Sequence, residues 1–321
     1  MNADSAPTPR ARVLLLGASG FIGRHVHQAL LAAGHTVRVA GRTAPQPAQR
    51  VDFARATQAA HWLPLLGEVD AVINTVGVLR DSARQPMQAI HADAPCALFT
   101  ACVQAGVRRV LHLSALGIDG SDTPYARTKR VADAHLLALH QAGALRATVL
   151  RPSLVVGPGS ASSRLFMALA RLPWLALPQA ALRTRVQPLA VGDLADAVAA
   201  LLGPLPTSAQ LPSQLPTLLP LGGPSALTLA QFIASLRAQA GHAPARVWPM
   251  PGGLTRASAR LGDALPLTPW GRQTLALLSA DNVTDPHTLG ALIGRAPVPP
   301  QQLLAHAQAA MPRPAKALSK T

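Results

Sequence analysis

Short apolar runs alternate with longer amphipathic stretches along the first half of the chain. The runs with the length of buried strands lie at 13–16, 36–40, 49–53, 69–76, 107–113 and 147–150. Apolar residues at spacings of three and four, typical of helices, cover 22–33, 86–105 and 124–140. Because strands and helices alternate, the pattern predicts an α/β fold built on a parallel sheet wound on both faces.

Three glycines follow the first predicted strand at three-residue steps. Gly17 lets the chain leave the strand, Gly20 lets the backbone approach a pyrophosphate, and Gly23 lets the following helix pack closely. The helix start then directs its free N–H groups at the phosphates. Ordinary strand–helix turns share this spacing, but the flanking strand and helix favour a Rossmann-like dinucleotide site. We expect the turn to bind the cofactor through Gly17, Ser19, Gly20, Phe21, Ile22 and Gly23.

Tyr125 and Lys129 lie four residues apart, and hence on one face of the predicted 124–140 helix. Tyr125 is the only tyrosine, and Lys129 is one of three lysines in a chain whose cations are otherwise arginines. We expect the ammonium to lower the pKa of the phenol towards neutrality and make it a proton carrier. The alternative is a surface pair without a role.

The net charge and the composition limit the classes of binding partner that we expect. The formal net charge is +15, but the arginines are scattered without a basic run, so we expect no nucleic-acid partner. The histidines and the two cysteines, Cys96 and Cys102, show no metal-ligand spacing, so we expect no metal. Two cysteines that cannot pair locally fit a reducing compartment, and no apolar run is long enough to span a membrane. We therefore expect a cytoplasmic protein.

The glycine turn and the Tyr125/Lys129 pair together resemble the short-chain dehydrogenase/reductase superfamily, in its extended, epimerase/dehydratase-like form. Five further segments resemble the atypical branch that includes the nucleotide-binding accessory subunit of respiratory complex I and its bacterial relatives. These segments are 72–77, 112–117, 150–159, 187–193 and 221–224.

The resemblance implies a role for each matching position. Tyr125 would be the acid/base, Lys129 would hold the nicotinamide ribose and tune the tyrosine, and Ser114 would polarise the substrate oxygen. The remaining cofactor contacts would be Asp52 and Phe53 at the adenine, Asn74, Val76 and Gly77 at the adenosine ribose, and Pro152 and Ser153 at the nicotinamide.

Two departures from the family pattern bear on catalysis. The position at which the family has its substrate-polarising serine is alternatively occupied by Ala115. In that case Ser121 or Thr123 would polarise the substrate oxygen instead. His91 stands where extended members have asparagine. Both departures weaken the case for redox chemistry and leave nucleotide binding intact.

The residues after the second predicted strand favour NADP(H) over NAD(H). NAD-preferring members carry an acid there to bind the ribose hydroxyls, whereas this chain has Arg42. A guanidinium suits a 2′-phosphate through paired charge-assisted hydrogen bonds. Arg24 is a second candidate for this contact.

After residue 152 the pattern changes, and Pro- and Gly-rich turns separate shorter predicted helices. We expect disordered tails at 1–10 and 311–321, a Rossmann domain at 11–160, and a smaller α+β substrate region at 161–310; whether this last part returns to the sheet is left open.

We predict an NADP(H)-dependent oxidoreductase that transfers hydride between nicotinamide and a carbonyl or secondary alcohol. The apolar segment 165–177 suggests a hydrophobic, quinone-like substrate. The same segment, flanked by arginines, alternatively contacts the inner face of a membrane. The alternative function is a non-catalytic NADPH-binding structural or assembly protein.

Overall fold

The computed structural model describes residues 10–203, 215–265, 270–278 and 280–309. The tails predicted at 1–10 and 311–321 lie outside these residues, apart from Arg10.

The strands are β1 (Arg12–Leu16), β2 (Thr36–Ala40), β3 (Ala71–Asn74), β4 (Arg109–Leu113), β5 (Arg146–Pro152), β6 (Val155–Val156), β7 (Trp174–Pro178), β8 (Arg185–Val186), β9 (Leu189–Ala190), β10 (Leu218–Leu221), β11 (Leu227–Thr228) and β12 (Arg246–Met250). The α-helices are α1 (Phe21–Ala32), α2 (Ala94–Gln104), α3 (Pro124–Gln141), α4 (Ala161–Arg171), α5 (Gln179–Arg183), α6 (Val191–Ala200), α7 (Leu229–Gln239), α8 (Gly252–Ala264), α9 (Arg272–Leu277), α10 (His287–Ile293) and α11 (Leu303–Ala309). A π-helical turn, η4 (Ala89–Asp93), leads directly into α2.

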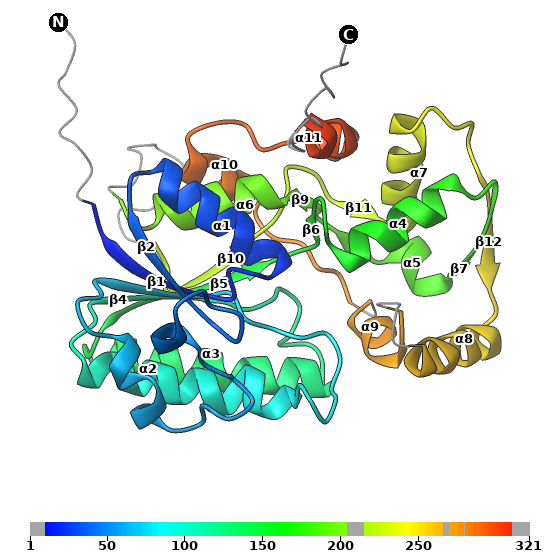
Figure 1. Ribbon diagram of the computed structural model, residues 1–321. Helices are drawn as coiled ribbons and strands as arrows, with labels where there is room; N and C mark the ends of the chain where they lie inside the picture. The colour runs from blue at the N-terminus through cyan, green and yellow to red at the C-terminus, as the bar shows by residue number, and fades with distance from the viewer. Residues whose placement is uncertain (1–9, 204–214, 266–269, 279, 310–321) are drawn as a thin grey trace, which may run out of the picture.

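The core of the fold is a six-stranded sheet in the order β10-β5-β4-β3-β1-β2, and every neighbouring pair is parallel. Helices cover both faces of the sheet, with α1 and α6 on one side and α2 and α3 on the other (Figure 1). The predicted doubly wound α/β fold is therefore confirmed. The order reverses between β1 and β3, and ligands bind beyond the strand ends at such a switch point.

Alternation along β1 shows why the sheet is covered on both faces. Leu14 and Leu16 pack into the apolar layer beneath α2 and α3, while Val13 and Leu15 pack into the layer beneath α1 and α6. All four side chains are at most 1% exposed. Each buried leucine stabilises the fold by about 1.5–3 kcal/mol relative to an exposed one. Exposure of either face of β1 to solvent would therefore lower the free energy of unfolding substantially.

The prediction of a short strand at 49–53 is wrong. Pro47–Gln49 forms a single 3₁₀ turn, and the only ladder-like contacts of this stretch are the Gly41 N–H to Gln49 and the Val51 N–H to Gly41. The Asp52 carboxylate then accepts a hydrogen bond from the N–H of Ala54, and this bond turns the chain away from the edge of the sheet. The segment keeps its apolar residues buried without joining the sheet, because its backbone is used in turns.

The chain returns to the sheet after residue 161. β10 adds the last parallel strand beside β5, and α6 packs along α1 with α10 behind it. Other elements of this half, among them α4, α7 and β7, enclose a separate apolar cluster that includes the fully buried Phe232. Within the described part of the chain, no helix combines the length and the apolar character needed to cross a membrane.

Candidate functional site

The turn between β1 and α1 is closed so tightly that glycine is required twice. Gly17 has a φ of +86°, and the N–H of Gly20 donates to its carbonyl at 2.9 Å. A Cβ on Gly23 would lie 2.0 Å from the Gly17 carbonyl oxygen, and one on Gly17 would lie 2.7 Å from Oγ1 of Thr75. The predicted glycine roles at Gly17 and Gly23 thus have a steric basis.

The start of α1 is arranged to receive an anion. Gly20 caps the helix without a side-chain hydrogen bond, and the first turn contains no acidic residue. The N–H groups at the helix start and its positive dipole end are therefore left to a phosphate. Phe21 and Ile22 occupy the first two positions of this helix, where backbone N–H groups lack intrahelical partners, and their predicted contact with the cofactor stays a prediction.

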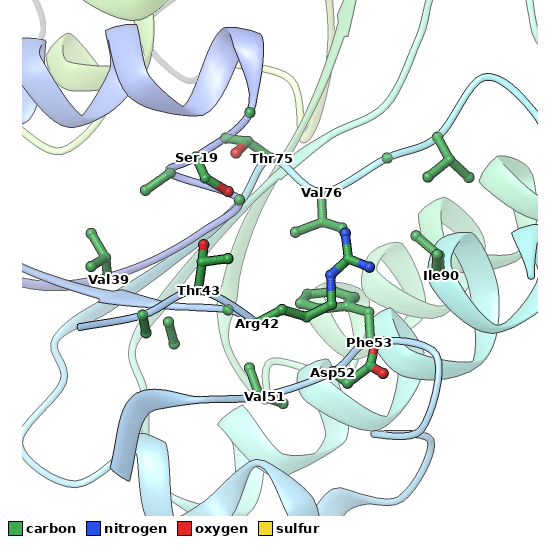
Figure 2. Close-up of a pocket in the computed structure, with 18 of the residues that line it drawn as sticks. Ser19, Val39, Arg42, Thr43, Val51, Asp52, Phe53, Thr75, Val76 and Ile90 are labelled. Atoms are coloured by element: carbon green, nitrogen blue, oxygen red, sulfur yellow. The ribbon is translucent and has the colours of Figure 1, made fainter. Parts of the chain in front are cut away.

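A cavity of about 430 Å³ lies at the carboxyl ends of β1, β2 and β3, where the strand order reverses (Figure 2). This volume is within the range of small-molecule sites, roughly 300–1,000 Å³. Eight predicted cofactor residues line it: Gly17, Ser19, Gly20, Arg42, Asp52, Phe53, Val76 and Gly77. Sequence reasoning missed other lining residues, among them His27, Thr43, Thr75, Val78, Arg84 and Gln85.

Arginine dominates the charge of this cavity. Arg42 follows β2, and Figure 2 shows its guanidinium extending past Phe53 towards Val76. Arg84 lies on the cavity rim in the turn that Ser82 and Gln85 close with paired backbone hydrogen bonds. Asp52 is the one acidic residue among the lining side chains. The cavity therefore favours an anionic ligand.

Arg24, the second candidate for the 2′-phosphate contact, lies elsewhere. Its Nη2 donates to the carbonyl of Pro158 at 2.5 Å, and its guanidinium carbon lies 5.8 Å from the centre of the Phe21 ring. It does not line the cavity. The alternative assignment of the 2′-phosphate to Arg24 therefore stays a prediction, without support from the cavity lining.

Asn74 shapes the cavity wall without lining it. Its side chain is fully buried, with Oδ1 accepting the N–H of Val76 and Nδ2 bonded to Nδ1 of His112. It positions the Thr75–Val78 stretch that forms the wall. The predicted direct contact of Asn74 with the ribose is replaced by this supporting role.

Pro152 and Ser153 connect the two halves of the chain. The carbonyl of Pro152 accepts the N–H of Leu116. Ser153 Oγ donates to the carbonyl of Asn282 at 2.8 Å and accepts the N–H of Gln187. Neither residue lines the cavity, so their predicted place beside the nicotinamide stays a prediction.

Tyr125 and Lys129 share one face of α3, as predicted. The helix begins at Pro124, with Thr123 capping the N–H of Ala126. Lys129 is 3% exposed and donates from Nζ to the carbonyl of Leu113 at 2.9 Å. A Cβ on Gly77 would lie 3.4 Å from that Nζ, so the ammonium sits directly under the cavity wall.

The expected pKa effect of the lysine on the tyrosine is wrong in this structure. Burial, with a smaller contribution from the Asp133 carboxylate, raises the pKa of Tyr125 to about 12. Burial lowers the pKa of Lys129 to about 8, and Asp133 opposes that change. Desolvation disfavours the phenolate, so Tyr125 keeps its proton at neutral pH.

Ser114 has a different partner from the one expected. It is 6% exposed, and its hydroxyl donates to Oδ2 of Asp133 at 2.9 Å; Arg151 also binds this oxygen. Ser114 thus belongs to a buried ionic cluster rather than to a substrate surface. The alternative donors Ser121 and Thr123 bond to each other, and Thr123 is committed to capping α3.

His91 lies in η4, at the position where asparagine was expected from the family pattern. Its Nε2 accepts the N–H of Val78 at 2.9 Å, and its Nδ1 is 3.2 Å from Oγ1 of Thr128. Burial, with the nearby Lys129 charge, lowers the pKa of His91 to about 2. The neutral imidazole therefore links the cavity wall to α3.

Comparisons with known proteins identify the family. The NAD dependent epimerase/dehydratase family model matches residues 13–204, which include the glycine turn, the cavity and the Tyr125/Lys129 helix. The chain belongs to this family. Family membership supports nicotinamide dinucleotide binding. The finer resemblance to the complex I accessory subunit stays a prediction.

Two curated relatives match part of the chain. The ceramide reductase of Caulobacter vibrioides is 28% identical over 197 residues, covering 59% of this chain and 60% of that protein. The sterol demethylase protein B of Methylococcus capsulatus is 29% identical over 171 residues, covering 45% of this chain and 52% of that protein. The matches thus span only about half to three-fifths of these relatives.

Solved structures share the fold over nearly the whole chain. That of gox2253 has a TM-score of 0.67 at 20% identity, covering 94% of this chain and 97% of the other. That of the Bordetella bronchiseptica enzyme WbmG, in complex with NAD, has a TM-score of 0.64 at 14% identity, covering 97% of each chain. The likeness extends the family fold into the second half of the chain, beyond the family match.

Proposed function

We propose that this protein is an NADP(H)-dependent reductase that converts a carbonyl of an apolar substrate to a secondary alcohol. The observation that carries the proposal is the cavity at the ends of β1, β2 and β3. Its glycine turn leaves room for a pyrophosphate, and Arg42 extends into it at the position where an acid would favour NAD. Thr43 and Arg84 add further polar groups to the lining of this cavity.

The cofactor would supply a hydride once bound. The backbone at Gly17–Gly23 would hold its pyrophosphate, and Arg42 would pair with a phosphate on its adenosine ribose. A protonated Tyr125, half-buried in the structure, would give its proton to the substrate oxygen, which suits reduction of a carbonyl better than oxidation of an alcohol. The Lys129 ammonium, held by the carbonyl of Leu113, would stabilise the phenolate that remains on Tyr125 when the proton leaves.

The apolar substrate class rests on two supports. The names of the curated relatives refer to a ceramide and a sterol, both lipids. In this chain, Phe166, Met167 and Leu169 of α4 are only partly buried on the apolar cluster of the second half. A hydrophobic carbonyl compound, including a quinone, fits this region better than a sugar nucleotide. Contact with the inner face of a membrane is part of the proposal, since such compounds reside there.

Nucleotide titration tests the cofactor assignment. Fluorescence binding with NADPH and NADH is compared between the wild type and Arg42→Ala. Loss of a charge-assisted phosphate contact should weaken NADPH binding by roughly 10- to 100-fold and leave NADH binding within about twofold. Arg55→Ala is the matched control, because Arg55 is an exposed arginine that does not line the cavity. Tighter binding of NADH than of NADPH by the wild type would overturn the assignment.

Turnover with Tyr125→Phe tests the chemistry. Aliphatic ketones and a short-chain quinone are screened for NADPH oxidation by the wild type and the variant. We expect the variant to bind NADPH normally and to lose about 100-fold or more in kcat, as removal of a general acid does. Equal rates would exclude Tyr125 as the proton donor.

The hydrogen bonding of Ser114 favours a second candidate function. Its hydroxyl hydrogen is committed to Asp133, so Ser114 has no hydrogen left to donate to a substrate oxygen. We propose as the alternative a structural or assembly protein that NADPH stabilises without turnover. Binding that raises the melting temperature, with no oxidation of NADPH by any substrate in the screen, would favour this alternative.

A further inference from the structure

An exposed aromatic face lies in the second half of the chain, on strands β7 and β12. The two strands pair in parallel, with Trp174 beside Arg246 and Ala176 beside Trp248. Because side chains alternate along a strand, Trp174, Trp248 and Arg246 share the outer face, whereas Leu175 is buried in the apolar cluster beneath. The two tryptophans are 55% and 60% exposed.

The side chains of this outer tryptophan face, defined as Trp174, Arg246 and Trp248, touch one another. The tryptophan rings have centroids 6.3 Å apart at an angle of 35°. The Arg246 guanidinium carbon lies 4.8 Å from the Trp174 ring centre, which is the geometry of a cation–π contact. The arrangement presents large apolar rings with one positive charge held on them.

Further apolar side chains continue the exposed surface. Leu172, two residues before Trp174, is also exposed, and α8 begins two residues after β12 ends. Along α8 and just beyond it, Leu254, Leu261 and Leu265 are about half to two-thirds exposed and recur at helical spacings. Figure 1 shows β7, β12 and α8 at the end of the molecule away from the central sheet.

The charge around this surface is positive. Arg171, Arg246, Arg256 and Arg260 lie on or beside it in the chain, and none of them forms an ion pair with the residues that the structure describes. The carboxylate of Asp263, in α8, is instead paired with Arg272 at 2.6 Å. A partner would therefore meet aromatic and aliphatic side chains surrounded by uncompensated guanidinium groups.

We propose that the outer tryptophan face docks on an anionic lipid bilayer. Tryptophan rings favour the boundary between headgroups and acyl chains, and arginines bind acidic headgroups while their stems remain in apolar surroundings. A second copy of this chain fits less well, because a symmetric contact would bring the same arginines together without counter-charges. The inference does not depend on hydride transfer, and it places an apolar substrate within reach of the second half of the chain.

Vesicle binding by the full-length protein tests the proposal without substrate or cofactor. Co-sedimentation is measured with vesicles of phosphatidylcholine alone and with an equal mixture of phosphatidylcholine and phosphatidylglycerol. Binding to the mixed vesicles should be at least about tenfold tighter, because each arginine near an anionic surface contributes about fivefold. Tryptophan emission should shift to the blue on binding, since Trp62 is already buried and Trp174 and Trp248 are exposed.

Substitutions of the tryptophans leave the net charge of +15 unchanged, so they separate specific docking from general electrostatic attraction. Trp174→Ala combined with Trp248→Ala should weaken binding to the mixed vesicles about tenfold or more, and Arg246→Glu should also weaken it. Leu31→Ala combined with Val131→Ala removes apolar side chains that are equally exposed on other helices and should have no effect.

Three outcomes would overturn the proposal. One is equal binding to both kinds of vesicle. Another is full binding by the double tryptophan variant while it keeps the wild-type melting temperature. The third is a dimer in solution that the tryptophan substitutions convert to a monomer, which would assign this face to a second copy.

Discussion

His91 presents its imidazole edge-to-face against Tyr125, with ring centroids 5.3 Å apart and planes at 88°. The same imidazole accepts the N–H of Val78, a residue of the cavity wall. One buried side chain thus connects the nucleotide cavity to the proposed proton donor. A neutral ring is required, because Nε2 must stay unprotonated to accept the Val78 hydrogen bond.

Acid should destabilise the protein through His91. Its pKa is about 2 in the folded state against 6.5 in the unfolded chain, so unfolding takes up a proton as the pH falls below 6.5. The free energy of unfolding should therefore fall from pH 6.5 towards pH 5, by at most about 1.4 kcal/mol per pH unit for one proton. Urea unfolding at several pH values should show a shallower slope for His91→Asn, with the exposed His61→Asn as control. An unchanged slope would assign the acid sensitivity to other groups.

Gly23→Ala should abolish dinucleotide binding. The added Cβ would lie 2.0 Å from the Gly17 carbonyl oxygen, so the turn and the helix start must separate. We expect NADPH affinity to fall at least about 100-fold and stability to fall by about 1–3 kcal/mol, as in overpacked sites. Gly67→Ala is the matched control, because a Cβ there has no neighbour within 4 Å. Calorimetric titration and thermal unfolding measure both effects, and normal binding by Gly23→Ala would show that phosphate does not use this turn.

The two carboxylates that bind Arg151 should differ sharply in their contributions to stability. Asp133 has a 2% exposed side chain and binds Arg151 together with Ser114, whereas the Asp119 side chain is 70% exposed. Asp133→Ala leaves the buried guanidinium with only the largely solvated Asp119 as its partner and should cost about 3–5 kcal/mol. Asp119→Ala removes a largely solvated partner and should cost less than about 1 kcal/mol. Chemical denaturation of both variants measures the difference, and similar losses would contradict the assignment of Asp133 as the buried partner.

Arg80→Ala should loosen the end of α8. The Arg80 guanidinium donates to the carbonyls of Gly262, Leu265 and Trp270, at or near the negative end of the helix dipole. Hydrogen exchange over 252–264 should accelerate by about tenfold, the equivalent of one lost charged hydrogen bond. NADPH affinity should stay within about twofold. The control is Arg127→Ala, whose guanidinium bonds only to the nearby carbonyl of Asp122. Unchanged exchange would mean that other contacts hold α8.

The sequence by itself determined five of the six strands of the sheet and the phosphate turn, because both depend on local patterns, whereas the place of β10 beside β5 was decided by the tertiary structure. Continuous apolar runs such as Val13–Leu16 require burial on both faces, and the steric need for glycine at 17 and 23 is set within one turn of chain. The position of Arg42 beside the cavity also follows from its place in the sequence. Arg42 comes just after β2, and the carboxyl ends of parallel strands lie at one edge of the sheet.

Only the tertiary structure decided the contacts between distant segments. Ser114 is bound by an aspartate nineteen residues away, and burial rather than the neighbouring lysine governs the Tyr125 pKa. The turn at Arg84, the wall residue Thr75 and the exposed pair Trp174 and Trp248 likewise come from chain segments whose proximity no short motif encodes. Side-chain partners and desolvation depend on the packing of the whole chain, whereas strand burial and turn geometry depend on a few consecutive residues.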